Sequence, residues 1–178
     1  MELQHLYAPW RSLYTRSISK TQREDSTHKE CIFCEKFADT NDREHFILRR
    51  FAYTTVVLNL YPYTPGHLMV IPNAHISKIH ELEPAAQTEL IYLTGQAARI
   101  FEEHVKAPGV NIGMNMGTAG GAGIPAHLHM HVMPRWIGDT NFITTVGHTR
   151  VISVDLNGIY DDLKEAFQRV PAISLSSK

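Results

Sequence analysis

The clearest pattern of hydrophobic and polar positions lies in residues 127–133, where histidines alternate with apolar side chains. His127, His129 and His131 are each followed by an apolar residue, and Pro134 ends the run. Strict alternation of this kind is typical of a half-buried strand. In a strand the three imidazoles project from one face, roughly 6.5 to 7 Å from one to the next. Neighbouring imidazoles repel one another when protonated and need hydrogen-bond partners when buried, so this pattern indicates a functional site.

Other segments also have the composition of strands. Residues 46–48 and 53–58 are rich in β-branched and aromatic side chains and are separated by a short polar break, which predicts a hairpin. Two prolines and a glycine predict a loop over residues 59–66. Further strands are predicted for residues 67–72 and 110–116.

Two helical patterns complete the chain. Pro84 begins the clearer one, since proline is well tolerated at the first helical position, and an apolar stripe continues to Val105. Pro108 and Gly109 follow the stripe and end the pattern. A C-terminal helix is predicted after Asp155, whose carboxylate can cap it. This order of strands and helices predicts an α+β domain with a mainly antiparallel sheet, a central helix and a C-terminal helix.

The composition fits one domain of 178 residues, with 43% hydrophobic and 20% charged residues. A net charge of −1 argues against binding nucleic acid by bulk electrostatics. No apolar run approaches the roughly 18 residues of a membrane span, and the N-terminus lacks a signal-peptide pattern. We therefore expect a cytoplasmic protein with neither a nucleic acid nor a membrane partner. Residues 1–30 are expected to form an arm that packs Trp10 and Tyr14 on the body, followed by a polar linker.

The only two cysteines are Cys31 and Cys34, in a C-x-x-C arrangement. Such a pair is half of a structural zinc site, which takes four ligands, so two more would have to come from elsewhere. A thioredoxin-like redox pair is the alternative, but it belongs at a strand–helix junction of a βαβ unit. The surrounding residues 27–41 are polar and follow no predicted strand, which favours zinc.

A glycine-rich segment, residues 117–123, leads directly into the histidine run. Glycine lets backbone N–H groups approach an anion closely, so this segment can form a phosphate cradle. It is not a Walker loop, because the Gly-Lys-Ser/Thr ending and the following helix are both missing. A flexible hairpin connection is an equally good interpretation of the segment alone.

Two chemistries need several imidazoles on one strand face. Alternate histidines can chelate a catalytic metal, or one imidazole can act as a nucleophile that its neighbours orient. A histidine nucleophile suits phosphorus, because the phosphoramidate that it forms is reactive enough for a second acceptor to displace. With the glycine-rich segment immediately upstream, the residues favour phosphoryl or nucleotidyl transfer over a metallohydrolase.

The histidine run resembles the signature of the histidine triad (HIT) family of nucleotide hydrolases and transferases, and residues 65–75 resemble that family's second segment. Residues 7–11 and 134–142 further resemble the branch of diadenosine tetraphosphate phosphorylases (ATP adenylyltransferases). The resemblance implies an α+β HIT-like fold, a homodimer, and attack on the α-phosphate of a bound nucleotide.

The same resemblance assigns roles to individual residues. His129 matches the nucleophile that becomes adenylylated, His131 the partner that contacts the phosphate, and His67 the residue that supports their orientation. Implied nucleotide-binding positions are Asn59 at the ribose hydroxyls, and Asn115, Gly120, Gly121 and Gly123 at the phosphate oxygens.

In relatives that carry C-x-x-C, a structural zinc is bound by two cysteines and two histidines. The matching residues are Cys31, Cys34, His75 and His127, a complete set for one closed site per chain. This assignment removes His127 from direct chemistry and implies no organic cofactor. The resemblance also implies an organisation in which residues 31–142 form the catalytic domain and residues 143–178 a C-terminal extension whose helix packs on it.

The expected reaction is cleavage of diadenosine tetraphosphate, or a related adenine nucleotide, through a covalent nucleotide on His129. Inorganic phosphate as acceptor would give ADP and ATP, whereas water would make the protein a hydrolase or a nucleoside phosphoramidase. Many relatives have a serine or glutamine before the first triad histidine, where this chain has Ile124, Pro125 and Ala126. A metallohydrolase and a non-catalytic nucleotide-binding module remain the alternatives from other functional classes.

Overall fold

The computed structural model describes residues 31–140, 142–147 and 155–173. The predicted N-terminal arm and linker lie outside these residues. The helices and strands, in chain order, are α2 (Ile32–Ala38), β1 (Ile47–Arg50), β2 (Thr54–Leu58), β3 (Leu68–Pro72), the 3-10 helix η2 (Ile79–Glu81), α3 (Pro84–Glu103), β4 (Gly109–Met114), β5 (Met130–Arg135), α4 (Phe142–Gly147) and α5 (Leu156–Gln168).

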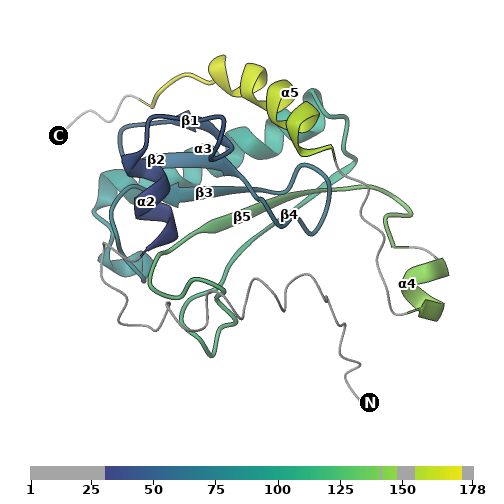
Figure 1. Cartoon of the computed structure of the whole chain (residues 1–178), viewed down its shortest axis with the longest axis horizontal. Coiled ribbons are helices and arrows are strands. Elements are labelled where there is room, and N and C mark those ends of the chain that lie inside the picture. Colours follow the sequence, from purple (N-terminus) through teal and green to yellow (C-terminus); the bar gives the residue numbers. More distant parts are fainter. Residues whose placement is uncertain (1–30, 141, 148–154, 174–178) are drawn as a thin grey trace.

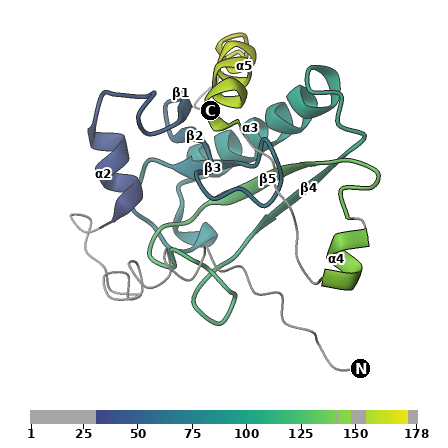
Figure 2. The ribbon, with the colours of Figure 1, turned by 45° about the vertical axis from the view of Figure 1, so that its right-hand side comes forward.

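The strands form one five-stranded antiparallel sheet in the order β1-β2-β3-β5-β4. Helices α3 and α5 cover one face of this sheet, and α2 lies against the other (Figures 1 and 2). The predicted α+β class is therefore confirmed, and the predicted hairpin is present as β1 and β2. No helix among the described residues is long and apolar enough to cross a membrane.

The α3 face of the sheet holds the larger core. Leu90, Leu93, Ala97 and Phe101 recur along α3 at helical spacing and are fully buried against the sheet. Pro84 occupies the first turn, as predicted, but the helix ends at Glu103, before the Pro108–Gly109 pair. Burial of its apolar stripe makes α3 the scaffold that supports the central strands.

Helix α5 is fixed at both ends. The Asp155 side chain accepts a hydrogen bond from the Gly158 N–H, which is the predicted N-terminal cap. Near the other end, the Arg49 guanidinium of β1 donates to the carbonyls of Phe167 and Val170. These contacts fasten the C-terminal helix to the first strand.

Two α-helices were not predicted. Residues 32–38 read as polar surroundings of the cysteines, yet they form α2, which buries Phe33 and Cys34 against the sheet. Residues from Phe142 onward form the short helix α4. Both helices are too short to show a repeated apolar stripe, so their periodicity is weak in the sequence.

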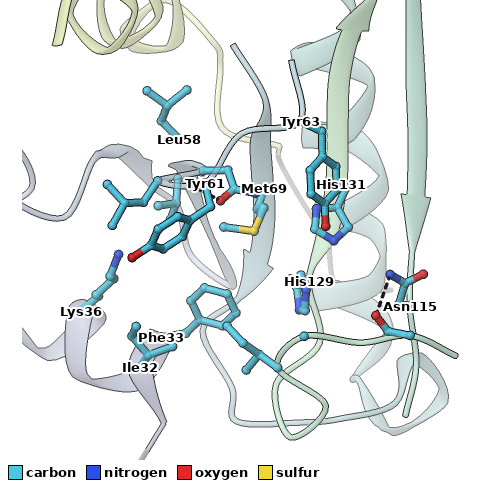
Figure 3. Close-up of a pocket in the computed structure, with 16 residues that line it drawn as sticks. Ile32, Phe33, Lys36, Leu58, Tyr61, Tyr63, Met69, Asn115, His129 and His131 are labelled. Carbon is cyan, nitrogen blue, oxygen red and sulfur yellow. Dashed lines mark hydrogen bonds between the residues drawn. The ribbon is translucent and has the colours of Figure 1, made fainter. Parts of the chain in front are cut away.

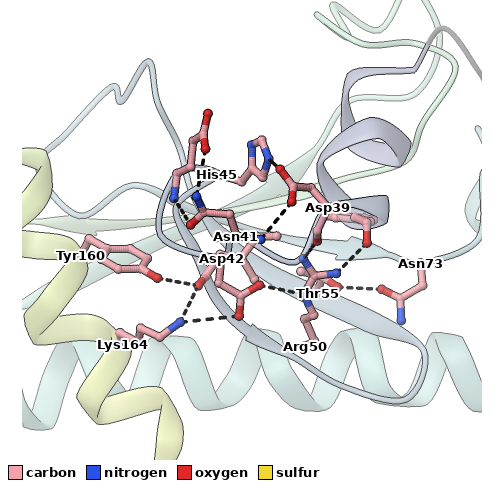
Figure 4. Close-up of polar contacts among 12 residues, drawn as sticks. Asp39, Asn41, Asp42, His45, Arg50, Thr55, Asn73, Tyr160 and Lys164 are labelled. Carbon is pink, nitrogen blue, oxygen red and sulfur yellow. Dashed lines mark hydrogen bonds and ion pairs between the residues drawn. The ribbon is translucent and has the colours of Figure 1, made fainter.

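Polar contacts hold the connection from α2 to β1 (Figure 4). Arg50 donates from Nε to the Asp42 carboxylate at 2.8 Å and from its two terminal nitrogens to the carbonyls of Phe37 and Asp39. The Tyr160 hydroxyl of α5 donates to the Ile47 carbonyl at 3.1 Å. Together these bonds fix the end of α2 relative to the sheet.

The histidine run differs from its predicted form, because β5 begins only at Met130. Pairing with β3 covers Leu68↔Val132 to Val70↔Met130, and does not extend to Pro72. Pro72 has no N–H to donate, and its carbonyl accepts a hydrogen bond from His127 Nε2 instead. The first two histidines therefore precede the strand, and only His131 lies within it.

Candidate active site and metal centre

A pocket of about 260 Å3 opens on the α2 face of the sheet. Cross-strand register places Val57, Met69 and His131 side by side on this face, since Val57 pairs with Met69 and Met69 with His131. Ile32 and Phe33 of α2 form an apolar wall opposite them. A pocket with apolar walls and a few polar groups suits a ligand that has both a flat apolar part and a polar part.

Polar groups gather at the two ends of this pocket (Figure 3). His129, His131 and Asn115 lie at one end, and Lys36 and Tyr61 at the other. Burial lowers the pKa of Lys36, an effect that the neighbouring Glu35 opposes. The apolar walls lie between these ends, so a bound molecule can place different groups on each.

His129 is held with one ring nitrogen available for chemistry. Its Nδ1 lies 2.8 Å from the His127 carbonyl oxygen, and because a carbonyl can only accept, Nδ1 carries the proton. Nε2 then carries the lone pair. Burial lowers the pKa of His129, which is only 4% exposed, although the bond to the carbonyl opposes the shift. A neutral imidazole with a fixed tautomer in a pocket wall is equipped to attack an electrophile.

His131 lies next to His129, with the two ring centroids 4.9 Å apart. Its Nδ1 is 2.9 Å from Nε2 of His67, a fully buried residue just before β3. The Tyr63 ring packs over both imidazoles, at 4.8 Å from His67 and 6.1 Å from His131. We call His67, His129 and His131 the pocket cluster.

The remaining triad histidine belongs to a different group. His127 Nδ1 lies 3.3 Å from Cys31 Sγ and 3.6 Å from Cys34 Sγ, and Cys34 Sγ lies 3.3 Å from His75 Nδ1. One donor atom from each of these residues falls within 4.8 Å of all the others. We call Cys31, Cys34, His75 and His127 the metal cluster, and its members are the residues that the family resemblance implies as zinc ligands.

The metal cluster fits zinc by its donor types and by its spacing. Tetrahedral Cys2His2 coordination separates the donor atoms by about 3.3 to 3.8 Å. The three sulfur–nitrogen distances given above fall in this range, and all four donor atoms lie within 4.8 Å of one another. His127 also donates from Nε2 to the Pro72 carbonyl at 2.8 Å, which leaves the lone pair of Nδ1 directed at the two sulfurs. A second partner that fixes the tautomer in this way is typical of metal-binding histidines.

A redox role for the cysteines has little support. Burial, together with the neighbouring Cys31, raises the pKa of the Cys34 thiol to about 12. Reactive thiols of redox pairs instead have lowered pKa values and partly exposed sulfur atoms, whereas both thiols here are buried. Coordination to a cation removes the proton outright, so this environment suits a metal ligand.

Phe33 joins the two clusters. Its ring centroid lies 5.4 Å from both the His127 and the His129 ring centroids, and the side chain is buried. Phe33 lies in α2, between the two cysteines in the chain. Metal binding by Cys31 and Cys34 would therefore also fix the position of this part of the pocket wall. Sequence reasoning missed Phe33, Lys36 and Tyr61 as pocket residues, since neither helix α2 nor the depth of the pocket was expected.

The glycine-rich segment is a tight turn. A Cβ on Gly120 would lie 2.3 Å from the Met116 carbonyl oxygen, and Gly121 has φ +82°, so both positions require glycine. The N–H groups of Gly121 and Ala122 donate to carbonyls within the turn. Asn115 Nδ2 lies 3.4 Å from the Gly121 carbonyl oxygen and holds the turn at the pocket.

Of the predicted nucleotide-binding residues, four line the pocket. Asn59 lies at the base of the loop after β2, and Asn115, Gly121 and Gly123 come from the segment between β4 and β5. Gly120 shapes the turn behind them and is not part of the lining. Ile124, three residues before the first triad histidine, also lines the pocket, so this segment offers an apolar side chain there.

Comparison with known proteins agrees with this arrangement. The HIT domain family model matches residues 40–136. The chain is 36% identical over 151 residues to "AP-4-A phosphorylase" of Mycobacterium tuberculosis, covering 85% of this chain and 77% of that protein. It is 30% identical over 89 residues to the asymmetrical "Bis(5'-nucleosyl)-tetraphosphatase" of Schizosaccharomyces pombe, covering 50% and 48% of the two chains.

Among solved structures, the fold is similar to that of a zinc-bound histidine triad family protein from Mycobacterium smegmatis. The TM-score is 0.65 at 25% identity, and the match covers 80% of this chain and 96% of that one. The bound zinc in that relative agrees with the donor set of the metal cluster. The histidine arrangement, the fold and the match over more than half of its length show that this chain belongs to the HIT domain family.

Proposed function

We propose that this protein is a nucleotidyltransferase that cleaves diadenosine tetraphosphate, or a related adenine nucleotide, through a covalent nucleotide on His129. The observation that carries the proposal is the fixed tautomer of His129, whose Nδ1 donates to the His127 carbonyl and whose Nε2 bears the lone pair. The pocket beside it combines apolar walls for a purine with polar groups for a sugar and a phosphate. The similarity to "AP-4-A phosphorylase" supports the choice of substrate.

In the first step, the His129 Nε2 lone pair attacks the α-phosphorus. A P–N bond forms, and the P–O bond to the leaving polyphosphate breaks, with its electron pair going to the departing oxygen of ATP. His131 donates a hydrogen bond to the phosphate oxygens as negative charge shifts onto them. Asn115 and the turn that contains Gly121 and Gly123 line the same end of the pocket and contribute to phosphate binding.

In the second step, an oxygen of inorganic phosphate attacks the phosphorus of the AMP group on His129. The new P–O bond forms as the P–N bond breaks, so ADP leaves and Nε2 recovers its lone pair. Water in the same position would give AMP. The AP-4-A phosphorylase relative supports phosphate as the acceptor.

The metal cluster has a structural role in this proposal. Cys31, Cys34, His75 and His127 would hold the zinc, which would supply a structural cross-link. This link would join α2, which contributes Ile32, Phe33 and Lys36 to the pocket, to the segment that carries His129. We further propose that residues 31–142 are the catalytic unit, and that residues 143–178 extend it through α5.

We also propose that the protein is a homodimer. Strand β4 ends the sheet and exposes Ile112 by 50%, and Ile91 of α3 is exposed by 58%. An apolar side chain at an open sheet edge favours pairing with another chain. Light scattering coupled to size exclusion should give twice the chain mass, and a single chain mass at working concentration would refute the dimer.

Product analysis tests the proposed reaction. Purified protein is incubated with diadenosine tetraphosphate, with and without inorganic phosphate, and the nucleotides are separated by chromatography. ADP plus ATP in the presence of phosphate is the expected result. AMP plus ATP at the same rate in both mixtures would identify water as the acceptor, and no product in either would refute the proposed substrate.

A trapping experiment tests the intermediate. Rapid acid-free quenching followed by peptide mass spectrometry should find one AMP group on the peptide that contains His129. The same peptide from the His129→Ala variant should carry none. An AMP group found on another residue would refute the assignment of the nucleophile.

A further inference from the structure

The side chain of Asn59 contacts both the pocket and the buried His67. Its Oδ1 accepts a hydrogen bond from the Tyr61 N–H at 2.9 Å. Because a backbone N–H can only donate, this bond identifies the oxygen of the amide and fixes its orientation. The nitrogen Nδ2 therefore faces His67 Nδ1, at 3.2 Å.

His67 Nδ1 receives a second donor. The Tyr63 N–H points at the same nitrogen, again at 3.2 Å. With two N–H groups directed at it, Nδ1 must carry the lone pair, so the proton of the neutral ring is on Nε2. His67 is fully buried, and a buried imidazole in the other tautomer would oppose a hydrogen to two donors.

The tautomer of His67 decides the tautomer of His131. The two rings meet through His67 Nε2 and His131 Nδ1, 2.9 Å apart. Since His67 Nε2 carries a proton, it donates a hydrogen bond to His131 Nδ1. The proton of the neutral His131 ring is therefore on its Nε2. That N–H is the group through which His131 can donate to a phosphate oxygen.

We propose that Asn59 is a positioning residue, which acts through His67 to keep the proton of His131 on Nε2. The inference rests on the proposed function, in which His131 donates to the phosphate. Asn59 retains one N–H on Nδ2 and one lone pair on Oδ1, so it can bind a sugar hydroxyl without giving up His67. The amide at the sugar position and the imidazole at the phosphate position are then one hydrogen-bonded unit.

The variant Asn59→Asp isolates this role with little change in shape. Aspartate still accepts from the Tyr61 N–H, but it places a second acceptor opposite His67 Nδ1 in place of a donor. A proton on His67 Nδ1 would satisfy this carboxylate, so we expect the His67 proton to move from Nε2 to Nδ1, although it then opposes the Tyr63 N–H. His67 Nε2 would no longer donate to His131 Nδ1. Asn111→Asp is the matched control, because Asn111 is exposed on β4 and does not line the pocket, and its oxygen accepts from Arg135, a bond that aspartate keeps.

Nitrogen-15 NMR of the imidazole rings tests the tautomers in the protein without substrate. The expected result is a protonated Nε2 and an unprotonated Nδ1 for both His67 and His131, retained in Asn111→Asp and lost for His67 in Asn59→Asp. A wild-type His67 protonated on Nδ1, or an unchanged His67 in Asn59→Asp, would overturn the proposal.

A substrate comparison separates positioning from sugar binding. Turnover of diadenosine tetraphosphate and of its 2',3'-dideoxy analogue is measured for wild type, Asn59→Asp and Asn111→Asp. If Asn59 acts through His67, kcat of Asn59→Asp falls by about 100-fold on both substrates, the scale for loss of one donor to the reacting phosphate. If the variant equals wild type on the dideoxy analogue, Asn59 acts only through the sugar and the proposal is wrong.

The two tests also distinguish failure of this inference from failure of the proposed function. A wild-type protein that cleaves no nucleotide refutes the function, while the NMR spectrum still reports the His67 tautomer. If the wild-type protein turns over the nucleotide and Asn59→Asp has the same kcat, only the proposed role of Asn59 is refuted, and the proposed function stands.

Discussion

The metal cluster and the pocket cluster share the histidine segment of residues 127–131, yet they are built differently. The metal cluster brings donors from separate parts of the chain around one point, so all of its ligand atoms face each other. The pocket cluster is a row, in which His67 contacts His131 and His131 packs against His129 at the pocket wall. The first arrangement is closed around an ion, and the second is open to a ligand.

The difference depends on which ring nitrogen the surrounding backbone occupies. His127 uses Nε2 to bind the Pro72 carbonyl and directs Nδ1 at the sulfurs, whereas His129 uses Nδ1 to bind the His127 carbonyl. In the proposed function, one carbonyl therefore prepares a metal ligand, and another prepares a nucleophile. The carbonyl that accepts from one ring nitrogen determines which nitrogen keeps the lone pair, and so which chemistry the histidine can perform.

The variant His129→Ala should lose the most activity. Turnover of diadenosine tetraphosphate should fall by about 10⁶-fold, the scale for removal of a covalent nucleophile. Metal content should remain equal to that of wild type, because His129 is not a member of the metal cluster. Steady-state kinetics and elemental analysis measure the two quantities, and near-normal turnover would contradict the role of His129.

Cys31→Ser should show the opposite profile. Zinc content should fall, and the free energy of unfolding should drop by about 4 kcal/mol, because a ligand of a closed structural site is lost. Elemental analysis and chemical denaturation provide the measurements. His129→Ala serves as the reciprocal control. Retained zinc in Cys31→Ser, together with metal loss in His129→Ala, would instead place a catalytic metal on the pocket histidines.

Phe33→Leu should have a smaller effect than the other two variants and should alter both the metal cluster and the pocket cluster. Loss of the ring contacts to His127 and His129 should lower the free energy of unfolding by about 1 kcal/mol and raise KM several-fold. Phe37→Leu is the matched control, since the Phe37 ring contacts His127 at 6.1 Å and does not line the pocket. If both variants raise KM equally, Phe33 has no particular role in linking the clusters.

Local patterns in the sequence predicted much of the fold. The β1–β2 hairpin, the α3 stripe from Pro84 and the Asp155 cap all depend on neighbours within a few residues, and each is present. Helix α2 was missed because its apolar side chains become informative only when they meet the sheet. The start of β5 was placed too early because the end of its pairing is set by Pro72, which lies more than fifty residues away in the chain.

The residue types of the site are evident from the amino-acid sequence: alternating histidines, a cysteine pair, a turn that needs glycine, and Asn59 eight positions before His67. Which atoms meet depends on the folded chain, including the contact of His67 with His131 and the pocket wall provided by α2. Spacing along a chain fixes the direction of a side chain, whereas a hydrogen bond to one ring nitrogen requires a partner from elsewhere. The protonated nitrogen of each imidazole is therefore a property of the folded protein.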